Sequence, residues 1–283
     1  MTVSLELQPD QQPARWDNHV DVYEAVFEPL TNAFARAALK QLDLHPGEKL
    51  IDIGAGSGGG ALIAAAEYGT EVLAIDGSQE MVARVETRRR QQPDCAGRIR
   101  AETMDGMALS LPDASFDAAI SVFGVILFPD AVGGMREIAR VLKPGGRAAV
   151  VTWTDTERYE LATRLIDAIA SVRGPQQPPT SLPAQLRFRE EAAFHTLLSA
   201  GGLVVDSIIR VEEQWRLPSA RWIADRIAFA PGLAALVAGL GSDCSAVMAT
   251  FVDALERDQG AGDVSLCAVA QIGTATKPLI TNE

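Results

Sequence analysis

Short apolar runs alternate with amphipathic segments through the middle of this chain. Runs rich in Val, Ile and Ala predict strands at residues 50–53, 71–75, 99–103, 118–122 and 147–152. Apolar side chains at helical spacing predict helices between them, at residues 61–68, 79–91 and 131–142. Strands that alternate with helices form a parallel sheet covered on both faces, because each right-handed crossover lays its helix on one face. The pattern therefore predicts an α/β core over residues 45–155.

The residues before this core have a different pattern. From residue 20 to residue 42, apolar side chains recur at helical spacing and are interrupted by Pro29, which predicts two consecutive helices. Residues 1–15 are mostly polar and contain two prolines, so we expect a poorly ordered lead there. Together these segments predict a helical cap over residues 1–44.

The residues after the core, 156–283, contain two more strand patterns that enclose a helical stretch. The strands are predicted at residues 203–217 and 264–273, and the helical insert between them at about 218–258. A proline-rich stretch at 174–183 predicts a loop. We expect the two strands to complete a seven-stranded, mostly parallel sheet, and the insert to form a lid over one end of it.

Composition and charge narrow the choice of partners. With 283 residues, 47% hydrophobic and 22% charged, the chain is long and apolar enough for a folded α/β protein. Its net charge of -12 repels phosphate-covered polymers and anionic membranes at long range. We therefore expect a small-molecule substrate, neither nucleic acid nor a membrane as a partner, and a monomer or a homodimer.

The cysteines and the start of the chain bear on the compartment. Cys95, Cys244 and Cys267 lie far apart and lack the close pairing typical of zinc sites and disulfide frameworks, so we expect free thiols and no metal site. The chain starts without the basic and apolar segments of a secretory signal, and its apolar stretches are broken short of the roughly 20 residues that cross a bilayer. These features predict a cytoplasmic protein.

The strongest candidate site follows the first strand of the core. Asp52-x-Gly54-x-Gly56-x-Gly58 joins a buried strand to a glycine-rich turn and a helix. Glycine permits positive φ and close approach of a ligand to the backbone, and a helix N-terminus offers free N–H groups. The next strand ends at Asp76, where a carboxylate can accept hydrogen bonds from both ribose hydroxyls of a nucleoside. The ligand predicted by these two features is a dinucleotide or S-adenosylmethionine.

A series of motifs gives the core a family resemblance. The series is Asp52-x-Gly54-x-Gly56-x-Gly58, Asp76, Met104-Asp105-Gly106, Leu111-Pro112-Asp113-x-Ser115-Phe116-Asp117 and the turn Leu142-Lys143-Pro144-Gly145-Gly146-Arg147. It resembles class I S-adenosylmethionine-dependent methyltransferases, which have a Rossmann-like sheet. Within that class it is similar to the methyltransferase type 11 branch of ubiquinone and menaquinone C-methyltransferases. The resemblance covers residues 45–155, and a phrase with Tyr23 and residues 27–31 extends it less specifically.

The resemblance implies S-adenosylmethionine as the cofactor, S-adenosylhomocysteine as the product, and C-, O- or N-methylation of a small molecule of quinone, isoprenoid or specialised metabolism. It also implies a cofactor-binding set at the C-terminal ends of successive strands. In that set Asp52 holds the ammonium group of the methionine part, Asp76 the ribose and Asp105 the adenine amino group. The set is Asp52, Gly54, Ala55, Gly56, Asp76, Gly77, Met81, Asp105, Gly106, Met107 and Ser121.

Catalytic and acceptor-binding residues have no comparable motif, because methyl transfer from an activated sulfonium needs mainly proximity and orientation. We expect acceptor contacts at Tyr23, Phe123, Trp153 and Trp222. Where the acceptor must lose a proton, His19 and Tyr23 in the cap are the titratable candidates for the base. A surface histidine and a packing tyrosine would explain the same two residues without catalysis.

Two other functions share parts of this site. An NAD-dependent dehydrogenase uses a glycine turn and an acidic strand end, but usually lacks the 142–147 turn and has a second nucleotide-binding half. A pericyclase or a binding protein built on the same fold binds S-adenosylmethionine without transferring its methyl group. Turnover to S-adenosylhomocysteine distinguishes a methyltransferase from the latter.

Overall fold

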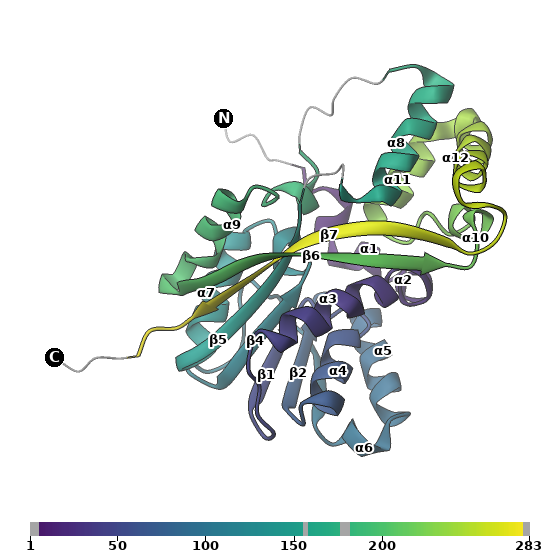
Figure 1. The fold of residues 1–283 in the computed structure, drawn as a ribbon. Helices are drawn as coiled ribbons and strands as arrows, with labels where there is room; N and C mark the ends of the chain where they lie inside the picture. The colour runs from purple at the N-terminus through teal and green to yellow at the C-terminus, as the bar shows by residue number, and fades with distance from the viewer. Residues whose placement is uncertain (1–5, 155–157, 176–181, 280–283) are drawn as a thin grey trace.

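A seven-stranded sheet forms the centre of the protein in a computed structural model that describes residues 6–154, 158–175 and 182–279 (Figure 1). The strand order is β3-β2-β1-β4-β5-β7-β6, with β7 antiparallel to both its neighbours and the remaining pairs parallel. The predicted Rossmann-like, mostly parallel sheet is thereby confirmed. The strands are β1 (Lys49–Ile53), β2 (Glu71–Asp76), β3 (Ile99–Thr103), β4 (Phe116–Val122), β5 (Leu142–Trp153), β6 (Val204–Leu217) and β7 (Val264–Thr276).

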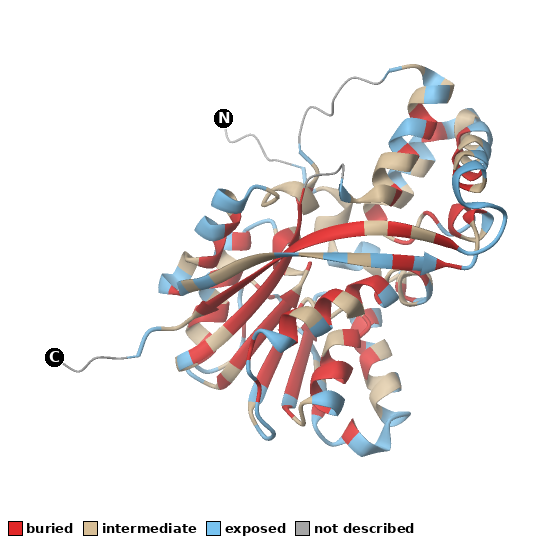
Figure 2. Ribbon diagram, viewed as in Figure 1, coloured by how far each residue is buried: buried red, intermediate tan, exposed pale blue. Residues whose placement is uncertain are grey.

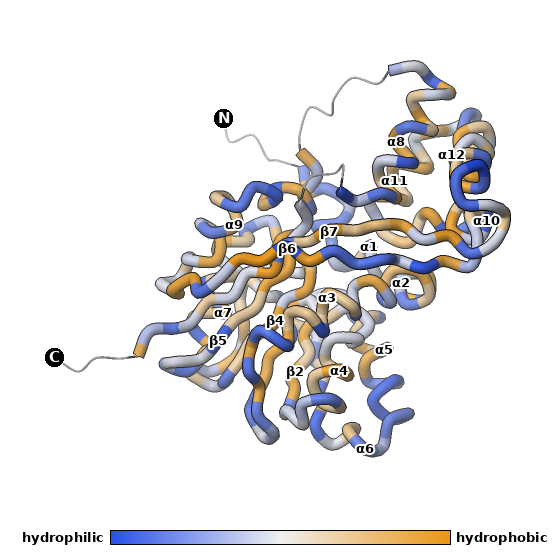
Figure 3. Tube along the Cα trace, in the orientation of Figure 1, coloured by the Kyte–Doolittle hydropathy of each residue, from blue (hydrophilic) through white to orange (hydrophobic). Residues whose placement is uncertain are grey.

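Helices cover both faces of this sheet. In β1, Leu50, Ile51 and Ile53 have no exposed surface, as expected for a parallel strand between two helical layers. Figure 2 shows the central strands as mostly buried, and in Figure 3 β2 and β4 are mostly hydrophobic. One face is covered by α3 (Glu28–Lys40), α4 (Gly59–Glu67) and α5 (Gln79–Arg90), and the other by α7 (Ala131–Val141) and α9 (Glu191–Leu198).

The N-terminal segment is better ordered than its sequence predicted. α2 (Val20–Val26) and α3 are the two expected consecutive helices. Pro29 lies in the first turn of α3, where backbone N–H groups have no partner within the helix, so its missing N–H costs no hydrogen bond. Before them, Pro9–Gln11 form a 3-10 turn and Pro13–Trp16 form the short helix α1. The expected disorder is therefore wrong for residues 6–15, which bond to distant parts of the chain. Residues 1–5 lie outside the described residues.

β6 and β7 form an antiparallel ribbon that extends past the end of β5. Trp153 of β5 pairs with Ala270 of β7, and the preceding residues of β7 continue along β6 to the pair Leu217–Val264. Figure 1 shows a helical lobe at this end of the ribbon. It consists of α8 (Glu160–Arg173), α10 (Ala220–Ala224), α11 (Pro231–Leu240) and α12 (Cys244–Gln259).

The predicted insert is present as α10 to α12, but its action as a lid and the division of the chain at residues 44 and 155 stay predictions. Residues 155–157 and 176–181, part of the predicted loop at 174–183, lie outside the described residues.

One apolar stretch is longer than expected from the sequence pattern, which predicts that every apolar run is too short to cross a bilayer. Pro231–Gln259 is long and apolar enough to span a membrane by length and composition. The chain turns within it at Gly241, whose φ of 54° separates α11 from α12. α12 packs on α8 and buries Val247, Phe251 and Leu255. These residues therefore fold as two helices of the lobe, and the cytoplasmic location stays a prediction.

Several motif residues of the family resemblance lie at the amino edge of the sheet, opposite the glycine turn. Asp117 accepts a hydrogen bond from the Lys49 backbone N–H at 3.0 Å and pairs with Lys143 at 2.6 Å. Arg147 pairs with Glu48 at 2.6 Å. The 142–147 motif was predicted as a turn before the fifth strand, but β5 already begins at Leu142. These motif residues hold adjacent strands together.

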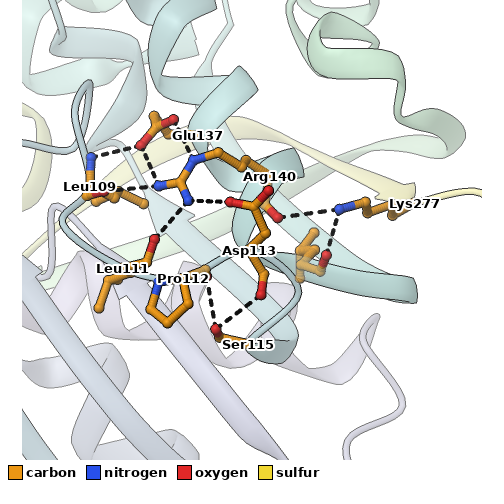
Figure 4. A network of polar contacts seen from close by, with 9 residues as sticks. Leu109, Leu111, Pro112, Asp113, Ser115, Glu137, Arg140 and Lys277 are labelled. Atoms are coloured by element: carbon orange, nitrogen blue, oxygen red, sulfur yellow. Dashed lines mark hydrogen bonds and ion pairs between the residues drawn. The ribbon is translucent and has the colours of Figure 1, made fainter.

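Figure 4 shows a second network at this edge, centred on Arg140 at the end of α7. Its guanidinium pairs with Asp113 at 2.7 Å and Glu137 at 2.8 Å, and donates to the Leu111 carbonyl at 2.7 Å. Lys277 then donates to the Arg140 carbonyl from the C-terminal side. The network fixes the segment before β4 onto α7.

Candidate functional site

The glycine turn after β1 brings the ends of β1 and β4 into backbone contact. Gly54 has a φ of 71° and Gly56 a φ of 55°, in the left-handed region that favours glycine. A Cβ on Gly54 would lie 2.8 Å from the Cα of Gly124, in the turn after β4. The N–H groups of Gly54 and Ala55 both donate to the Ile75 carbonyl at 2.9 Å. The turn is therefore fixed between β2 and β4 by main-chain contacts.

Asp76 ends β2 and holds the turn from the other side. Its carboxylate accepts hydrogen bonds from the N–H groups of Gly56 and Ser78, each at 2.9 Å. Burial raises the pKa of this carboxyl, against the opposing effect of these bonds. A carboxylate has about four lone-pair positions, so it can still accept bonds from ligand hydroxyls. The residue predicted for the ribose thus lies beside the turn predicted for the methionine part.

A small hollow of about 20 Å³, room for a single water molecule, lies between the glycine turn and the cap. Asp52 is in it and is only 3% exposed. Burial and the neighbouring Asp76 raise the pKa of Asp52 to about 7, while the Ala61 N–H lowers it. A cation in the hollow would favour the ionised carboxylate. The lining residues are Tyr23, Glu28, Thr31, Asn32, Ala35, Asp52, Gly54, Ala55, Gly59, Gly60 and Val122.

The cap adds a second buried carboxylate to this hollow. Glu28, 5% exposed, accepts hydrogen bonds from the Ser57 hydroxyl at 2.7 Å and from Arg88 at 2.5 Å. Arg88 compensates one negative charge, whereas Glu28, Asp52 and Asp76 carry three when ionised. The hollow therefore favours a cationic ligand.

The sequence interpretation missed Glu28 as a site residue, although the sequence contains a signal for it. Glu28, Thr31, Asn32 and Ala35 recur at helical spacing, so they share one side of α3. Leu30, Phe34 and Ala38 make the same helix amphipathic. Polar side chains beside the apolar face indicate a polar space against the sheet.

The N-terminal segment crosses from the lobe to the cofactor side of the sheet. We call residues 7–17 the strap. Asp10 accepts a hydrogen bond from the Gly232 N–H at 2.6 Å, at the N-terminus of α11, where a carboxylate also matches the helix dipole. Nearby, the Gln8 side chain accepts from Ala184 N–H at 2.8 Å. These bonds attach one end of the strap to segments more than 150 residues away.

The other end of the strap lies on the turn after β2. Asp17 accepts a hydrogen bond from the Ser78 hydroxyl at 2.5 Å. Pro13 lies against Gly77, so closely that a Cβ on Gly77 would be 2.8 Å from the proline ring. Because Gly77 is predicted to line the adenine side, an adenosine could enter here only if the strap moves.

Two more predicted cofactor residues are buried in the protein. The Ser121 hydroxyl donates to the Ile53 carbonyl at 2.7 Å and accepts from the Val125 N–H at 2.9 Å. These bonds brace the ends of β1 and β4, so Ser121 positions the turn. Met81 is 2% exposed, and its N–H donates to the Ser78 hydroxyl at the start of α5. Contact of either side chain with the cofactor stays a prediction.

The predicted adenine-binding residues lie on the turn after β3. The Met104 N–H donates to the Asp76 carbonyl at 3.0 Å, which sets this turn beside β2. Asp105 is exposed, and its carboxylate accepts from the Met107 N–H at 2.9 Å. Gly106 is buried, and a Cβ there would lie 2.4 Å from the Phe128 ring. The structure thus brings the three predicted segments to one edge of the sheet.

His19 and Trp222 are outside this constellation. Neither is among the residues that line the hollow. His19 Nδ1 lies 2.8 Å from the Arg15 carbonyl, and its ring meets Trp16 edge-on. Trp222 is in α10, with the Arg226 guanidinium 4.8 Å from its ring centroid. The roles of His19 as a base and of Trp222 as an acceptor contact stay predictions.

Aromatic side chains from the cap, the strand ends and the lobe meet in one cluster, which we call the aromatic seam. Phe27 of the cap stacks on Phe229 of the lobe at 4.9 Å and contacts Trp215 of β6 at 5.8 Å. Phe123 and Trp153, two predicted acceptor contacts, stack at 4.1 Å. The seam consists of Phe27, Phe34, Phe123, Trp153, Tyr159, Trp215 and Phe229.

Tyr23 joins the seam to the hollow. Its ring meets Phe27 at 5.7 Å, and its hydroxyl lies 3.5 Å from the Thr31 hydroxyl. A Cβ on Gly56 would be 3.5 Å from the Tyr23 hydroxyl, so this group faces the glycine turn. Burial raises the pKa of Tyr23, which keeps the hydroxyl protonated near neutral pH. Tyr23 is therefore suited to donate a hydrogen bond at the boundary between hollow and seam.

Among residues 6–154, 158–175 and 182–279, no group of three or more His, Cys, Asp or Glu side chains could hold a metal ion. Cys95, Cys244 and Cys267 are free thiols.

Sequence comparison relates the chain to known methyltransferases. Residues 51–150 match the family described as a methyltransferase domain. Demethylmenaquinone methyltransferase of Corynebacterium efficiens is 34% identical over 183 residues, which cover 60% of this chain and 74% of that protein. The enzyme of the same name from Corynebacterium kroppenstedtii is 36% identical over 154 residues, 52% of this chain. The chain spans 62% of the length of that second relative.

Structural comparison agrees on the fold. The crystal structure of the cyclase SpnF aligns with a TM-score of 0.63 and 21% identity over 97% of this chain and 98% of that one. YcgJ from Bacillus subtilis aligns with a TM-score of 0.56 and 20% identity, over 86% of this chain and 97% of that one. At these identities the likeness concerns the fold alone. The sequence matches, in contrast, remove the dehydrogenase alternative and show that this chain belongs to the S-adenosylmethionine-dependent methyltransferase family.

Proposed function

We propose that this chain transfers the methyl group of S-adenosylmethionine to a small molecule with an apolar ring. The observation that carries the proposal is the acidic hollow beside Asp76, at the point where the strand order reverses between β1 and β4. Open α/β sheets bind ligands at this point. The cofactor, when bound, supplies an already activated methyl group. The protein then has to bind the cofactor and the acceptor and to orient them toward each other. Proximity and orientation account for about 7–11 kcal/mol of the barrier in well-aligned reactions.

The residues of the hollow fit the charges of this cofactor. Asp52 and Glu28 provide negative charge for its ammonium and sulfonium groups, and Asp76 provides acceptors for the ribose hydroxyls. The backbone of Gly54 and Gly56 allows close approach of the methionine part. No base is assigned, because Tyr23 stays protonated and His19 does not line the hollow.

The aromatic seam supports an acceptor with an apolar ring. Buried aromatic side chains provide large apolar contact areas and favour other rings in stacked or edge-on geometry. Relatives of the chain include the 2-methyl-6-phytyl-1,4-hydroquinone methyltransferase of Synechocystis, 37% identical over 114 residues, and the 27-O-demethylrifamycin SV methyltransferase of Amycolatopsis mediterranei, 35% identical over 135 residues. The names of these relatives, together with the seam, favour a ring-containing acceptor of the quinone or polyketide type.

Substitution of Asp76 tests the cofactor site. Asp76→Ala removes the ribose acceptor and the bonds that hold Gly56 and Ser78, so affinity for S-adenosylhomocysteine should fall at least tenfold, about 1.4 kcal/mol. Titration calorimetry measures the change. Asp94→Ala, on an exposed residue of the short helix Pro93–Ala96, is the matched control and should bind like the wild type. Equal affinities in both variants would contradict the assigned ribose site.

Turnover tests the reaction itself. The protein is incubated with S-adenosylmethionine and a panel of hydroquinones, phenols and polyketide alcohols, and S-adenosylhomocysteine is measured by mass spectrometry. Formation of this product with at least one acceptor, and not without acceptor, is expected. Tight binding of S-adenosylmethionine without turnover across the panel would favour the alternative of a binding protein or pericyclase.

A further inference from the structure

The Arg88 side chain joins the glycine turn to the cap. It lies on α5, and its guanidinium donates to the Ser57 carbonyl of the turn at 2.9 Å and pairs with Glu28 of α3 at 2.5 Å. Its Nε lies 3.6 Å from a carboxylate oxygen of Glu24 on α2. The side chain is 18% exposed, so bulk water screens these contacts weakly. Arg88 therefore holds both cap helices against the turn.

One oxygen of the Glu28 carboxylate takes part in both contacts with the turn. Glu28 Oε1 accepts hydrogen bonds from the Arg88 guanidinium and from the Ser57 hydroxyl, at 2.5 and 2.7 Å. The second oxygen, Oε2, forms no hydrogen bond with the described residues and is not sealed from water. Because Glu28 is 5% exposed and lines the hollow, this oxygen is available to a ligand group there.

The hollow matches one part of the cofactor. It has room for a single water molecule, and an ammonium group is about the same size. Such a group has three N–H donors and no acceptor, so it binds best among oxygen acceptors. Asp52, Glu28 and Asn32 all carry side-chain oxygens and line the hollow. The size and the charge of this space therefore suit the ammonium end of the methionine part.

Glu28 depends on Arg88 for its charge and for its direction. A buried carboxylate without a compensating partner takes up a proton, and the nearby carboxylate of Asp52 adds repulsion. The bond from Arg88 to the Ser57 carbonyl also fixes the guanidinium relative to the turn. A methionine at position 88 would fill similar space and make neither contribution.

We propose that Arg88 is a positioning residue that keeps the Glu28 carboxylate ionised and directed into the hollow, where it binds the ammonium group of the cofactor. The inference rests on the proposed function and deepens it, because it assigns recognition of the amino-acid part to the cap and α5 in addition to Asp52. Arg88 itself does not touch the cofactor. A ligand with the adenosine but without the amino acid gains nothing from this pair.

The test compares two ligands that differ in the amino-acid part. S-adenosylhomocysteine and 5′-methylthioadenosine are titrated by calorimetry into the full-length protein; the second has a methyl group in place of the amino-acid chain. The wild type should bind S-adenosylhomocysteine about 30-fold more tightly or better. In Arg88→Met this ratio should fall about tenfold through weaker S-adenosylhomocysteine binding, with the affinity for 5′-methylthioadenosine unchanged. Arg88→Lys keeps the charge and should restore part of the ratio.

Glu28→Gln tests the same interaction from the other side. It keeps the shape of the side chain but removes the charge, so it should lower the ratio as much as Arg88→Met does. The double variant should lose no more than either single variant, because both substitutions remove one interaction. Additive losses would mean that Arg88 does not act through Glu28. Glu28→Gln and Arg88→Lys keep the test decisive where Arg88→Met fails to fold.

Arg84→Met is the matched control. Arg84 lies one turn before Arg88 on α5, and its ion pairs are with Asp21 and Glu24 of α2. This variant should lower the thermal midpoint and keep the wild-type ratio. An unchanged ratio in Arg88→Met, the same fall in Arg84→Met, or an equal loss of 5′-methylthioadenosine affinity would overturn the proposal.

The ligand ratio does not depend on methyl transfer. The expected ratios without turnover of any acceptor would count against the proposed function alone, and a wild-type ratio in both Arg88→Met and Glu28→Gln would count against the positioning role alone. A wild-type protein that binds neither ligand would overturn both.

Discussion

The cofactor half and the acceptor half of this site are built from different materials. Around the hollow, main-chain groups of one glycine turn and the carboxylates of Asp52 and Asp76 form one wall, and Glu28 and other polar residues of the cap form the other. The aromatic seam is built from side chains of the cap, the turn after β4, β5, β6 and the lobe. A change of one side chain should therefore alter acceptor binding easily, whereas cofactor binding should respond mainly to changes of backbone or charge.

The sharpest test of this contrast adds one methyl group to the turn. Gly54→Ala would place a Cβ 2.8 Å from the Gly124 backbone at a φ of 71°, so strain and overpacking should reduce affinity for S-adenosylhomocysteine by about 100-fold or more. Gly47→Ala has a φ of 84° but no atom within 4 Å, and it controls for the backbone strain alone. Calorimetry should find wild-type affinity in Gly47→Ala. Comparable losses in both would show that the contact with β4 is unimportant.

The raised pKa of the Asp52 carboxyl predicts how stability and cofactor affinity depend on pH. Its pKa in the folded protein is about 7, above the ordinary value of 3.8, so the folded state binds more protons than the unfolded state between these pH values. The stability of the cofactor-free protein should therefore fall as pH rises from about 4 to 7. Affinity for S-adenosylmethionine should rise about tenfold between pH 6 and 8, because the cation favours ionised Asp52.

Asp52→Asn separates this effect from other titrations. The variant should lose most of the pH dependence of cofactor binding, bind S-adenosylmethionine more weakly at pH 8, and be more stable than the wild type at that pH in the absence of cofactor. Fluorescence titration and thermal unfolding at several pH values measure these quantities. An unchanged pH profile in Asp52→Asn would assign the titration to another group.

The smallest expected effect concerns the acceptor half. Phe229→Leu keeps an apolar side chain but removes the ring contacts with Phe27 and Trp215, worth about 0.5–1.5 kcal/mol per aromatic pair. The KM for a ring acceptor should rise about three- to tenfold, with cofactor affinity unchanged. Phe194→Leu is equally buried on the other face of the sheet and should lose stability without a change in KM. A matching loss of cofactor affinity in Phe229→Leu would contradict the claim that the acceptor half and the cofactor half of the site respond separately to substitution.

The contrast also explains how much could be predicted from sequence. The turn at Gly54 and the strand end at Asp76 were predictable because their chemistry is local: a run of glycines and a carboxylate after an apolar strand. The motifs at Asp117 and Arg147 identified the family, yet in the structure they stabilise the amino edge of the sheet. Recognition of a family therefore does not require that every motif residue touch the ligand.

The strap and the seam could not be predicted in this way. Asp10 caps α11, and Pro13 packs on Gly77. Both partners are distant in the chain, and the local sequence, which is polar and proline-rich, carries no pattern that predicts these contacts. Tyr159 carries no motif, and its place in the seam depends on the end of β5 and on the ribbon. Ser121 was correctly placed at the strand end, but its hydroxyl is engaged by backbone groups that periodicity does not reveal.

The main-chain contact between Gly54 and Gly124 has a consequence for how such an enzyme diversifies. The junction is formed by main-chain atoms and braced by the Ser121 hydroxyl, so substitutions of acceptor-side residues in the lobe leave its shape unchanged. Descendants of this protein can exchange residues of the lobe, and so adopt new acceptors, while the platform for the methyl donor is inherited intact.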